Sequence, residues 1–473
     1  MYITDEGSIV ARDLDIQALE RIVGASNVST RDADLDAHSI DESHSRPGRA
    51  DVVVWPTTTD QVSALLAWAQ RERVPVVPWS AGSSLEGNPV PCHGGLLLAM
   101  YRMNKVLEIR ERDLQVVVQP GMVYAELNKE LGRKGMFFPP APGSSEVATI
   151  GGMVSNNSSG MRAVKYGVTR DYILSLEVVL AGGQVLRVGS NATKSSSGYD
   201  LVDLFVGSEG TLGVVTEVTM RVAGLPERVI AVTSSFPTLD GATSAVYETL
   251  RCGLDPAAIE ILDAETMRIT NEQQGLCLPI MPTLFVEFHG SNDGLAQEID
   301  YLHDICDECG AVRFDAAEFT EAREALWRAR REARESIKHT HPGKTLIGGD
   351  ACVPMSRFGE LISYAHALAV ESGVRIYAFG HAGDGNLHTE AIVDGDDPAS
   401  FALGEELTAK IIRRALEMGG TATGEHGVGL MKRSFMRQEH GAALDLMRTI
   451  KNALDPLGIM NPGKIFPEEQ PTE

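Results

Sequence analysis

Residues 142–160 have the sequence Pro142-Gly-Ser-Ser-Glu-Val-Ala-Thr-Ile-Gly-Gly-Met-Val-Ser-Asn-Asn-Ser-Ser-Gly160. Glycine, serine and asparagine dominate this segment, and apolar side chains are few. Such a segment cannot form a core of its own, but it offers many small hydrogen-bond donors and acceptors. Its glycines also let the backbone approach a ligand closely. The composition therefore predicts a loop that lines a large polar ligand.

Two further glycine-rich segments lie on either side of this loop. Trp79-Ser-Ala-Gly-Ser-Ser-Leu-Glu-Gly87 follows the apolar run 74–78, which we expect to be a buried strand. Val206-Gly-Ser-Glu-Gly-Thr-Leu-Gly-Val-Val215 places glycines in an otherwise β-prone run. A Gly/Ser turn after a strand can point several backbone N–H groups at one phosphate, although the same turn also serves as an ordinary chain reversal. Three separated loops of this kind indicate a ligand threaded between them.

The common nucleotide motifs do not account for these loops. No Gly-x-Gly-x-x-Gly turn joins a strand to a helix, which argues against a nicotinamide site. Gly343-Lys344-Thr345 ends like a phosphate-binding P-loop, but Lys338 occupies the position of the first glycine. The ligand of the three loops is therefore a different nucleotide or cofactor.

Two histidine-containing segments suggest a metal site. Gly380-His-Ala-Gly-Asp-Gly-Asn-Leu-His388 places two imidazoles beside a tight glycine-rich turn between two apolar strands. Neutral imidazole is a common ligand for zinc and manganese. Thr423-Gly-Glu-His-Gly-Val-Gly429 adds the Glu425 carboxylate and the titratable base His426. The alternative for both segments is a turn whose polar side chains only cap the backbone.

With these loops and motifs together, the chain resembles FAD-dependent enzymes of the vanillyl-alcohol-oxidase type. Within them it is similar to cytochrome-linked D-lactate dehydrogenases, glycolate oxidase flavin subunits and D-2-hydroxyglutarate dehydrogenases. The resemblance implies an α+β fold and bound FAD. The implied cofactor-binding residues are Trp79, Ser80, Ala81, Gly82, Ser83 and Ser84 at the pyrophosphate; Pro142, Gly143, Ser144, Thr149, Gly151, Gly152, Ser155, Asn156 and Gly160 along the flavin and ribityl chain; Glu209, Gly210 and Val215 near the adenine; and Asn461 at the flavin edge. Some relatives attach FAD covalently, but the pyrophosphate turn contains no histidine, so we expect noncovalent FAD.

The resemblance also assigns roles at the second site. It implies that His381, His388 and Glu425 bind a divalent metal, either zinc or manganese, and that His426 is the general base. A 2-hydroxy acid can chelate such a metal, which lowers the pKa of its hydroxyl group. Leu326-Trp-Arg-Ala-Arg330 matches the family's Leu-Trp-x-x-Arg, whose last residue binds the substrate carboxylate. A helix over 319–337 would place Trp327, Arg330 and Arg334 on one stripe, so Arg334 is a further candidate for binding substrate.

Three positions differ from the D-2-hydroxyglutarate dehydrogenases. Arg334 replaces a threonine, Gly348 replaces a lysine and Glu390 replaces an asparagine. A distal substrate carboxylate would lose the lysine and could meet Glu390. These departures favour a small monocarboxylate such as D-lactate or glycolate over 2-hydroxyglutarate, although Arg334 leaves a second carboxylate open.

The chain is expected to divide near Leu225. We predict an FAD-binding domain over 46–225, a substrate- and metal-binding cap domain over 226–440 with an antiparallel sheet, and a tail over 441–473 that returns to the first domain. The second half alternates apolar strands with helical patterns. The predicted strands are 230–236, 283–289, 374–379 and 386–393, and the predicted helices are 237–252, 295–310, 319–337, 356–372 and 399–418.

Composition limits the partners. The 473 residues carry a net charge of −23, which disfavours nucleic acid. No apolar segment is long enough to span a membrane, and residues 1–16 do not resemble a secretory signal. The six scattered cysteines fit a reduced, cytoplasmic setting; attachment at the membrane periphery and a homodimer stay open. Electrons from the flavin would pass to a quinone, a cytochrome, an electron-transfer flavoprotein or an iron–sulfur partner subunit.

Several alternatives compete with a D-lactate-type dehydrogenase. The enzymatic ones are a glycolate oxidase flavin subunit and a D-2-hydroxyglutarate dehydrogenase. A noncatalytic FAD-binding subunit of an oxidase complex belongs to another class, and the full set of His381, His388, Glu425 and His426 argues against it. A metal-dependent hydrolase would leave the three flavin loops unexplained.

Overall fold

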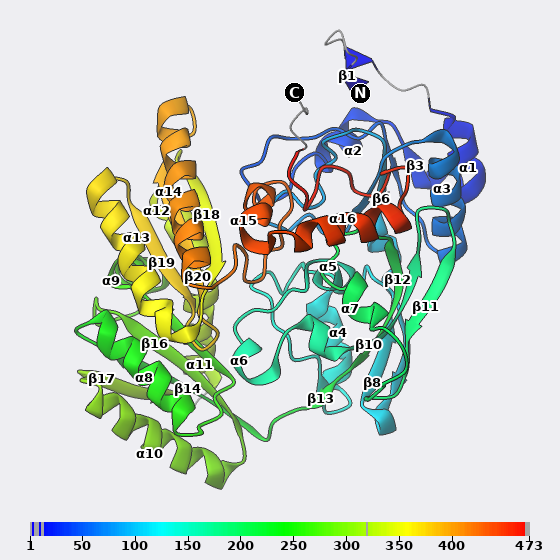
Figure 1. Ribbon diagram of the computed structural model, residues 1–473. Coiled ribbons are helices and arrows are strands. Elements are labelled where there is room, and N and C mark those ends of the chain that lie inside the picture. Colours follow the sequence, from blue (N-terminus) through cyan, green and yellow to red (C-terminus); the bar gives the residue numbers. More distant parts are fainter. Residues whose placement is uncertain (1, 4–8, 11–13, 318–319, 469–473) are drawn as a thin grey trace. The chain divides into compact units, whose positions relative to one another are not determined.

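The computed structural model describes residues 2–3, 9–10, 14–317 and 320–468 of the chain (Figure 1). The chain forms two compact units. The first unit comprises 1–159, 168–225 and 425–473, and the second comprises 160–167 and 226–424. Each unit therefore takes segments from distant parts of the sequence.

The first unit contains a four-stranded sheet with the order β3 (Val28–Ser29), β4 (Val52–Val54), β6 (Leu96–Ala99) and β5 (Val76–Trp79). The last three strands are parallel. They are apolar at nearly every position, as expected for strands covered on both faces. Helices α1 (Ile16–Val23) and α3 (Thr59–Glu72) bury their apolar stripes against one face. The loop that follows β5 is the predicted pyrophosphate turn.

A second sheet in this unit is antiparallel, with the order β11 (Val185–Gly189), β10 (Ile173–Val179), β12 (Val214–Arg221), β8 (Gln115–Val118) and β7 (Val106–Arg110). Further helices of the unit are α2 (Asp32–Ala37), α4 (Tyr124–Gly132), α5 (Ile150–Asn156), α7 (Leu201–Phe205), α15 (Met436–His440) and α16 (Ala443–Leu454). The short strands β9 (Met136–Phe137) and β13 (Ala223–Gly224) pair with each other. The glycine-rich segment 142–160 thus contains one short helix, α5, between loops.

The C-terminal segment of the chain extends the parallel sheet. The amide of Val76 donates to the carbonyl of Ile459, and the amide of Asn461 donates to the carbonyl of Val76, each at 2.8 Å. These two bonds place Asn461 beside the strand that leads into the pyrophosphate turn.

The second unit is built on a seven-stranded sheet in which every neighbouring pair is antiparallel. Its order is β17 (Arg313–Ala317), β14 (Arg228–Ser235), β16 (Thr283–Gly290), β15 (Ala258–Leu262), β19 (Ile376–His381), β20 (Asn386–Val393) and β18 (Thr345–Cys352). The antiparallel sheet expected from the resemblance is confirmed. The sheet holds more strands than the four predicted, and β15, β17 and β18 were missed.

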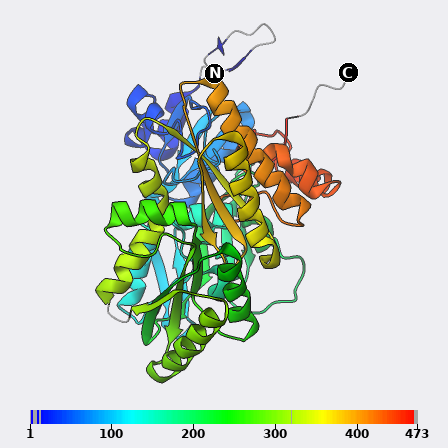
Figure 2. The same ribbon diagram turned by 90° about the vertical axis from the view of Figure 1, so that its left-hand side faces the viewer.

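Helices cover both faces of this sheet. One face packs against α8 (Leu239–Arg251), α10 (Asn292–Glu308), α13 (Phe358–Ser372) and α14 (Pro398–Glu417). Figures 1 and 2 show α13 and α14, in yellow and orange, beside β18–β20. The other face packs against α9 (Ala264–Gln274), α11 (Thr320–Arg331) and α12 (Ala333–Thr340). Successive strand residues alternate between the two faces, which decides the side on which each candidate side chain lies.

Two sequence predictions require correction. The helix predicted over 319–337 is two helices, α11 and α12, that meet at Glu332, and residue 319 lies outside the described residues. Arg334 therefore does not share one uninterrupted helix with Trp327 and Arg330. The second unit also ends at Gly424 rather than near residue 440, because residues 428–431 form hydrogen bonds with Glu86 and Glu209 of the first unit.

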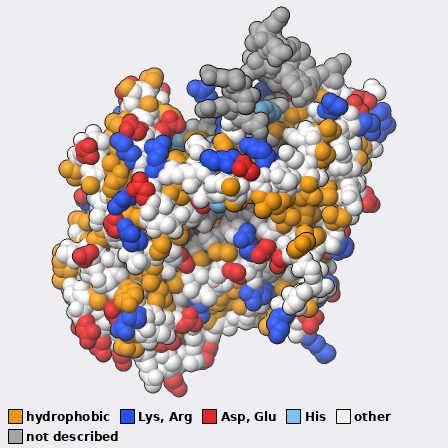
Figure 3. All heavy atoms as spheres, in the orientation of Figure 1, with side chains coloured by type: hydrophobic (Ala, Val, Ile, Leu, Met, Phe, Trp, Pro, Cys, Tyr) orange, Lys and Arg blue, Asp and Glu red, His pale blue; other side chains and the backbone are white. Residues whose placement is uncertain are grey.

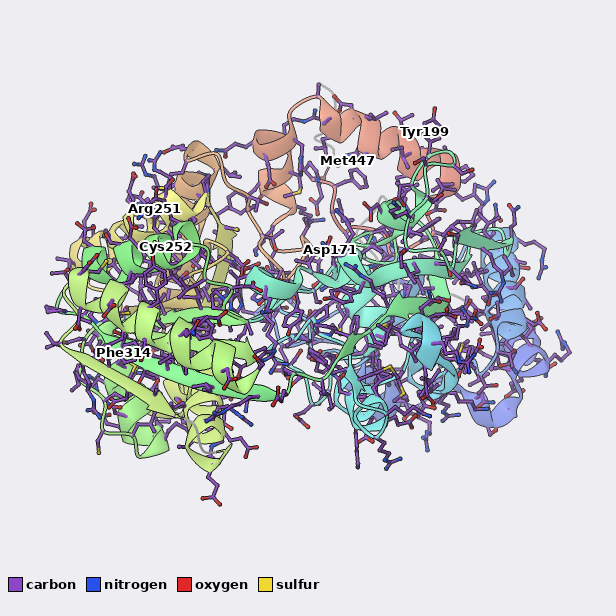
Figure 4. The ribbon with its side chains drawn as sticks, turned by 90° about the horizontal axis from the view of Figure 1, so that it is seen from below. Asp171, Tyr199, Arg251, Cys252, Phe314 and Met447 are labelled. Carbon is purple, nitrogen blue, oxygen red and sulfur yellow. The ribbon has the colours of Figure 1, made fainter. Side chains whose placement is uncertain are left out.

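The six cysteines are free thiols distributed between the units. Cys306 belongs to α10 and is buried in the core, whereas Cys252 and its neighbour Arg251, labelled in Figure 4, lie at the end of α8. Acidic and basic side chains are interspersed on the face drawn in Figure 3. Among the described residues, no helix combines the length and the apolar character that crossing a membrane requires.

Candidate functional site

The second unit gathers candidate side chains on the sheet face covered by α11 and α12. Tyr377 and Phe379 of β19 point into the core on that face, so His381, two residues further along, points the same way. Strand register then places charged partners opposite the two histidines. The cross-strand pairs are Glu260 with His381, Asp350 with His388, and Gly348 with Glu390.

The two histidines face each other. Their Nε2 atoms lie 3.2 Å apart, and both side chains are buried. Nδ1 of His381 lies 2.6 Å from Oε1 of Glu260. A carboxylate on Nδ1 fixes the ring orientation and leaves Nε2 as the outward-facing nitrogen, which is the usual support for a metal-binding histidine. Two converging Nε2 atoms can share a hydrogen bond or ligate one cation.

Asp350 organises the other end of this cluster. It is fully buried, and its Oδ1 accepts a hydrogen bond from Nδ2 of Asn386 at 2.7 Å. Its Oδ2 accepts from Oγ1 of Thr423 and from the amide of Gly424, at 2.8 and 2.9 Å. Nδ1 of His388 lies 3.7 Å from Oδ1 of the same carboxylate. Asp350 thus fastens the segment 423–424, which leads directly into Glu425.

Arg330 lies beside Glu260 rather than on a solvated surface. It is 4 % exposed, and its Nη2 lies 2.5 Å from Oε2 of Glu260. The two charges are close, but the N–H and the oxygen are not aligned for a hydrogen bond. Among the described residues, Nε and Nη2 of Arg330 have no hydrogen-bond acceptor. Buried guanidinium donors are rarely left in this state, so Arg330 retains capacity for an anionic ligand.

Arg334 forms a different ion pair on α12. Its Nε donates to Oε1 of Glu390 at 2.8 Å, and the carboxylate of Glu390 is buried. A Cβ atom built on Gly348 would lie 3.5 Å from the Glu390 carboxylate. The three positions at which the sequence departs from the D-2-hydroxyglutarate dehydrogenases are therefore neighbours in space.

In the first unit, the pyrophosphate turn offers unused backbone donors. No described residue accepts a hydrogen bond from the amides of Ala81, Gly82 or Ser83. Gly82 has a φ of +69°, and a Cβ there would lie 2.5 Å from the Trp79 ring. The turn is secured by the Asp41 carboxylate, which accepts from Oγ of Ser84 and from the amide of Gly87. Burial raises the pKa of Asp41 above its ordinary value, against the hydrogen bonds that lower it.

The segment 142–160 contributes one capped helix and several small residues. Oγ1 of Thr149 accepts from the amide of Gly152 at the start of α5. A Cβ on Gly151 would lie 2.6 Å from Pro120, so only glycine fits there. Nδ2 of Asn156 donates to the backbone carbonyl of His426 at 3.0 Å. This bond ties the segment to the turn that carries the candidate base.

Glu209 holds that same turn. Its carboxylate accepts from the amides of Val428 and Gly429 at 2.7 and 2.8 Å and from Nδ2 of Asn88. Burial raises the pKa of Glu209, opposed by these donors. Its backbone carbonyl accepts from Nδ2 of Asn461 at 2.7 Å. The Glu209 side chain is thus engaged in the protein itself, and Asn461 is buried beside it.

The remaining predicted cofactor residues are dispersed within the first unit, except Gly160, which begins the segment 160–167 of the second unit. Pro142 is buried, and the space in which Gly143 would carry a Cβ atom is open. The carbonyl of Ser144 accepts hydrogen bonds from the amides of Val147 and Ala148. The carbonyl of Ser155 accepts from the amide of Glu209 at 2.8 Å. A Cβ on Gly210 would lie 2.9 Å from Pro78. The other members of the set are Trp79 and Ser80 at the end of β5, Gly160 with a φ of +104°, and Val215 in β12.

The Glu425–Gly429 turn presents two polar side chains. Oε2 of Glu425 accepts from Oγ of Ser159 at 3.2 Å, and Nε2 of His426 lies 3.7 Å from Oε1 of Glu425. On its other side, Nδ1 of His426 lies 3.4 Å from Oε1 of Glu86. The backbone carbonyl of His426, held by Asn88 and Asn156, fixes the turn independently of the imidazole.

Sequence reasoning missed several of the charged partners. Glu260, Glu86 and Lys432 are all buried. Glu260 contacts His381 and Glu86 contacts His426, whereas Lys432 contacts Glu86. A signal for Glu260 existed, because it is a single acid inside the apolar run Ala258-Ile-Glu-Ile-Leu262. An acid in such a run is seldom buried without a partner. Glu86 and Lys432 gave no comparable signal, since both lie in polar turns.

Comparison with known proteins identifies two matching family models. Residues 50–189 match an FAD binding domain, and residues 225–465 match the C-terminal domain of FAD linked oxidases. The probable mitochondrial D-lactate dehydrogenase of Danio rerio is 37% identical over 95% of this chain and 91% of its own length. The glycolate oxidase subunit GlcD of Bacillus subtilis is 36% identical over 98% of both chains.

Solved structures share the fold at lower identity. The 4-ethylphenol oxidase of Gulosibacter chungangensis superposes with a TM-score of 0.80 at 20% identity, over 96% of this chain and 97% of its own. A p-cresol methylhydroxylase superposes with a TM-score of 0.78 at 16% identity, over 95% of this chain and 96% of its own. The predicted vanillyl-alcohol-oxidase-type fold is confirmed.

Proposed function

Because the chain belongs to the FAD-linked oxidases and is an FAD-linked oxidoreductase, we propose that it oxidises a small D-2-hydroxy acid, with D-lactate favoured, to the 2-oxo acid. The observation that carries this proposal is the cluster of His381, His388, Glu260 and Arg330 on one face of the second unit's sheet. It combines converging imidazoles with a buried guanidinium, which are the groups that a chelating hydroxy-carboxylate requires.

The first unit fits FAD. The unused amides of Ala81, Gly82 and Ser83 suit a pyrophosphate, and Gly151 keeps the 142–160 segment close to Pro120. When bound, FAD would accept a hydride from C2 of the substrate. We propose that it is held noncovalently, since residues 79–87 contain neither histidine nor cysteine. Acid precipitation should leave a colourless protein pellet and a yellow supernatant, whereas a yellow pellet would contradict this assignment.

The metal would be held by His381, His388 and Glu425. Glu425 follows Gly424, whose amide is fastened to Asp350, and consecutive Cα atoms are only about 3.8 Å apart. Chain continuity therefore supports the third ligand. A bound divalent cation, zinc or manganese, would lower the pKa of the substrate hydroxyl. Glu260 would keep His381 oriented for this task.

The remaining tasks fall to two side chains. Arg330 would bind the substrate carboxylate with the donors that Glu260 leaves unused. His426 would take the proton of the C2 hydroxyl at Nε2, because its Nδ1 side is directed at Glu86.

The Arg334–Glu390 pair supports a monocarboxylate substrate. Glu390 neutralises the guanidinium that a second carboxylate would need, and it would repel that carboxylate. D-2-hydroxyglutarate is therefore the less favoured alternative. A glycolate oxidase flavin subunit is the second candidate, because the similarity to the Bacillus subtilis subunit spans nearly the whole chain.

The proposal also covers the electron acceptor and the cellular location of the protein. Reduced flavin would pass its electrons to a quinone, a cytochrome, an electron-transfer flavoprotein or an iron–sulfur subunit. A cytoplasmic location stays a prediction, and the Danio rerio relative is named as mitochondrial. A noncatalytic FAD-binding subunit would have no use for the buried His381–His388 pair.

The test is anaerobic mixing of the holoenzyme with D- and L-lactate, glycolate and D-2-hydroxyglutarate, followed at the flavin absorbance band. D-lactate should bleach the flavin fastest, and metal removal by a chelator should abolish bleaching until zinc or manganese is returned. Faster bleaching by D-2-hydroxyglutarate would overturn the substrate assignment. Full-rate bleaching without metal would overturn the metal assignment.

A further inference from the structure

Glu86 of the first unit contacts the segment 426–432, which carries His426, through both its backbone and its side chain. The backbone carbonyl of Glu86 accepts from the amides of Leu430 and Met431 at 2.8 and 3.2 Å. A Cβ on Gly429 would lie 2.1 Å from that carbonyl, so the two backbones pass in close contact. The main chain of Glu86 is therefore fixed relative to the turn.

The Glu86 side chain lies close to His426 within the turn and to Lys432, which follows the turn. Oε1 lies 3.0 Å from Nζ of Lys432 and 3.4 Å from Nδ1 of His426. Glu86 and Lys432 are 4 % and 2 % exposed. The amide of Lys432 donates to the carbonyl of Val428, which anchors the lysine to the turn. One carboxylate oxygen thus faces both a buried ammonium group and the candidate base.

A buried ion pair at this place is not explained by stability. Removing two charges from water costs more than an apolar pair of similar volume would, and such pairs often stabilise the fold little or not at all. An apolar pair here would remove the carboxylate oxygen that lies 3.4 Å from Nδ1 of His426. The pair therefore fits a requirement of the imidazole.

We propose that Glu86 is a positioning residue for His426. Its Oε1 accepts the Nδ1 proton, which selects the tautomer in which Nε2 carries no hydrogen and can act as a base. Lys432 holds the carboxylate in place and balances its charge. The same logic orients the imidazole of a catalytic triad, where the carboxylate fixes the tautomer without itself becoming protonated. This inference rests on the proposed role of His426 as the base.

The kinetic test compares holoenzyme variants at residue 86. Glu86→Leu should slow anaerobic flavin reduction by saturating D-lactate at least about tenfold, with KM changed less than about threefold and FAD content unchanged. Glu86→Gln keeps an oxygen acceptor for Nδ1 and should retain most of the rate. The solvent isotope effect on reduction should rise in Glu86→Leu, because proton removal becomes slower.

Matched variants separate positioning from folding. Glu177 is another buried acid of the first unit, paired with Arg187 at 2.7 Å on the five-stranded sheet. Glu177→Leu should lower the melting temperature comparably and leave both the rate and the isotope effect unchanged. The double variant Glu86→Leu/Lys432→Met removes both buried charges; it should recover stability but not the rate. Recovery of the rate in the double variant would overturn the proposal.

A spectroscopic measurement needs no turnover. Long-range 1H–15N spectra of histidine-labelled holoenzyme, with His426 assigned by its loss in His426→Ala, should show the Nδ1–H tautomer in the wild type and a mixture in Glu86→Leu. An Nε2–H tautomer in the wild type would overturn the positioning role. If the wild type shows Nδ1–H but no 2-hydroxy acid reduces its flavin, the proposed function fails while the tautomer assignment holds.

Discussion

In the first unit the turn that carries His426 is held largely by hydrogen bonds to its backbone, whereas in the second unit His381 and His388 lie in strands beside buried charges. Asn88 and Asn156 fix the His426 turn through its carbonyl, and Glu209 fixes it through two amides. His381, by contrast, depends on the carboxylate of Glu260, which itself faces Arg330. Hydrogen bonds to the backbone hold the His426 turn whichever side chain stands at position 426, whereas the orientation of the His381 ring depends on the Glu260 side chain. The two regions should therefore respond differently to the same kind of mutation.

The largest effect is expected from removing the imidazole of His426 while the backbone hydrogen bonds of its turn are kept. His426→Ala should reduce the rate of flavin reduction by about 10²–10⁴-fold, the usual contribution of a general base. FAD content should stay at the wild-type level, because alanine keeps the carbonyl that Asn88 and Asn156 hold. Stopped-flow absorbance and the ratio of flavin to protein measure the two quantities. His440→Ala on α15 is the control; a His426→Ala rate within tenfold of wild type would contradict the role.

The second prediction concerns the buried charges of the sheet. Glu260→Gln should lower metal affinity or kcat/KM by about 10–100-fold, the effect typical of losing the group that orients a metal ligand. It should also shift the urea midpoint downward, since Arg330 would lose its buried counter-ion. Glu265→Gln, at an exposed pair with Arg268 on α9, should change neither quantity. Equal behaviour of the two variants would remove the distinction between the regions.

A smaller effect is expected from the Arg334–Glu390 ion pair, which we propose selects D-lactate over D-2-hydroxyglutarate. Glu390→Gln should release Arg334 and raise the ratio of kcat/KM for D-2-hydroxyglutarate over D-lactate by about tenfold, because one charged hydrogen bond is worth about 1.5–3 kcal/mol. Glu335→Gln removes only the weaker contact of Arg334, at 3.7 Å, and should leave the ratio unchanged. An unchanged ratio in Glu390→Gln would show that the pair does not select against a second carboxylate.

The smallest effect tests the pair of His366 on α13 with Asp263, which follows β15. The hydrogen bond that Nε2 of His366 donates to Oδ2 of Asp263, at 2.8 Å, raises the pKa of His366 above its ordinary value despite partial burial. A raised pKa means that the imidazolium stabilises the folded state fully below about pH 6.5 and that this stabilisation is lost as pH rises through the higher folded value. His366→Gln should therefore lower Tm by about 1–3 °C at pH 5.5 and by less at pH 8.5. A difference that grows toward alkaline pH would contradict the assignment.

Much of the candidate site follows from local sequence. The composition of 142–160 predicted a ligand loop because no apolar face was available for packing. The segment 380–388 predicted a hairpin with histidines at both ends, and β19 and β20 pair in that way. The strand over residues 258–262 was not predicted, because five residues carry too little periodicity to distinguish a short strand from a helix. Glu260, which lies in this strand, was therefore missed as well. The break at Glu332 was missed because the apolar spacing continues across it.

The sequence by itself determined the family of fold, the three glycine-rich loops and the residue types available for chemistry, since these depend on composition and on patterns shorter than a turn or a strand. The tertiary structure decided which charges meet. Glu260 contacts His381 although 121 positions separate the two residues in the sequence. Glu86 contacts His426 and Lys432, which also lie far from it in the sequence. Such partners depend on strand register and loop closure over the whole chain. Local propensity sets the period of a segment but not the neighbour against which that segment is buried.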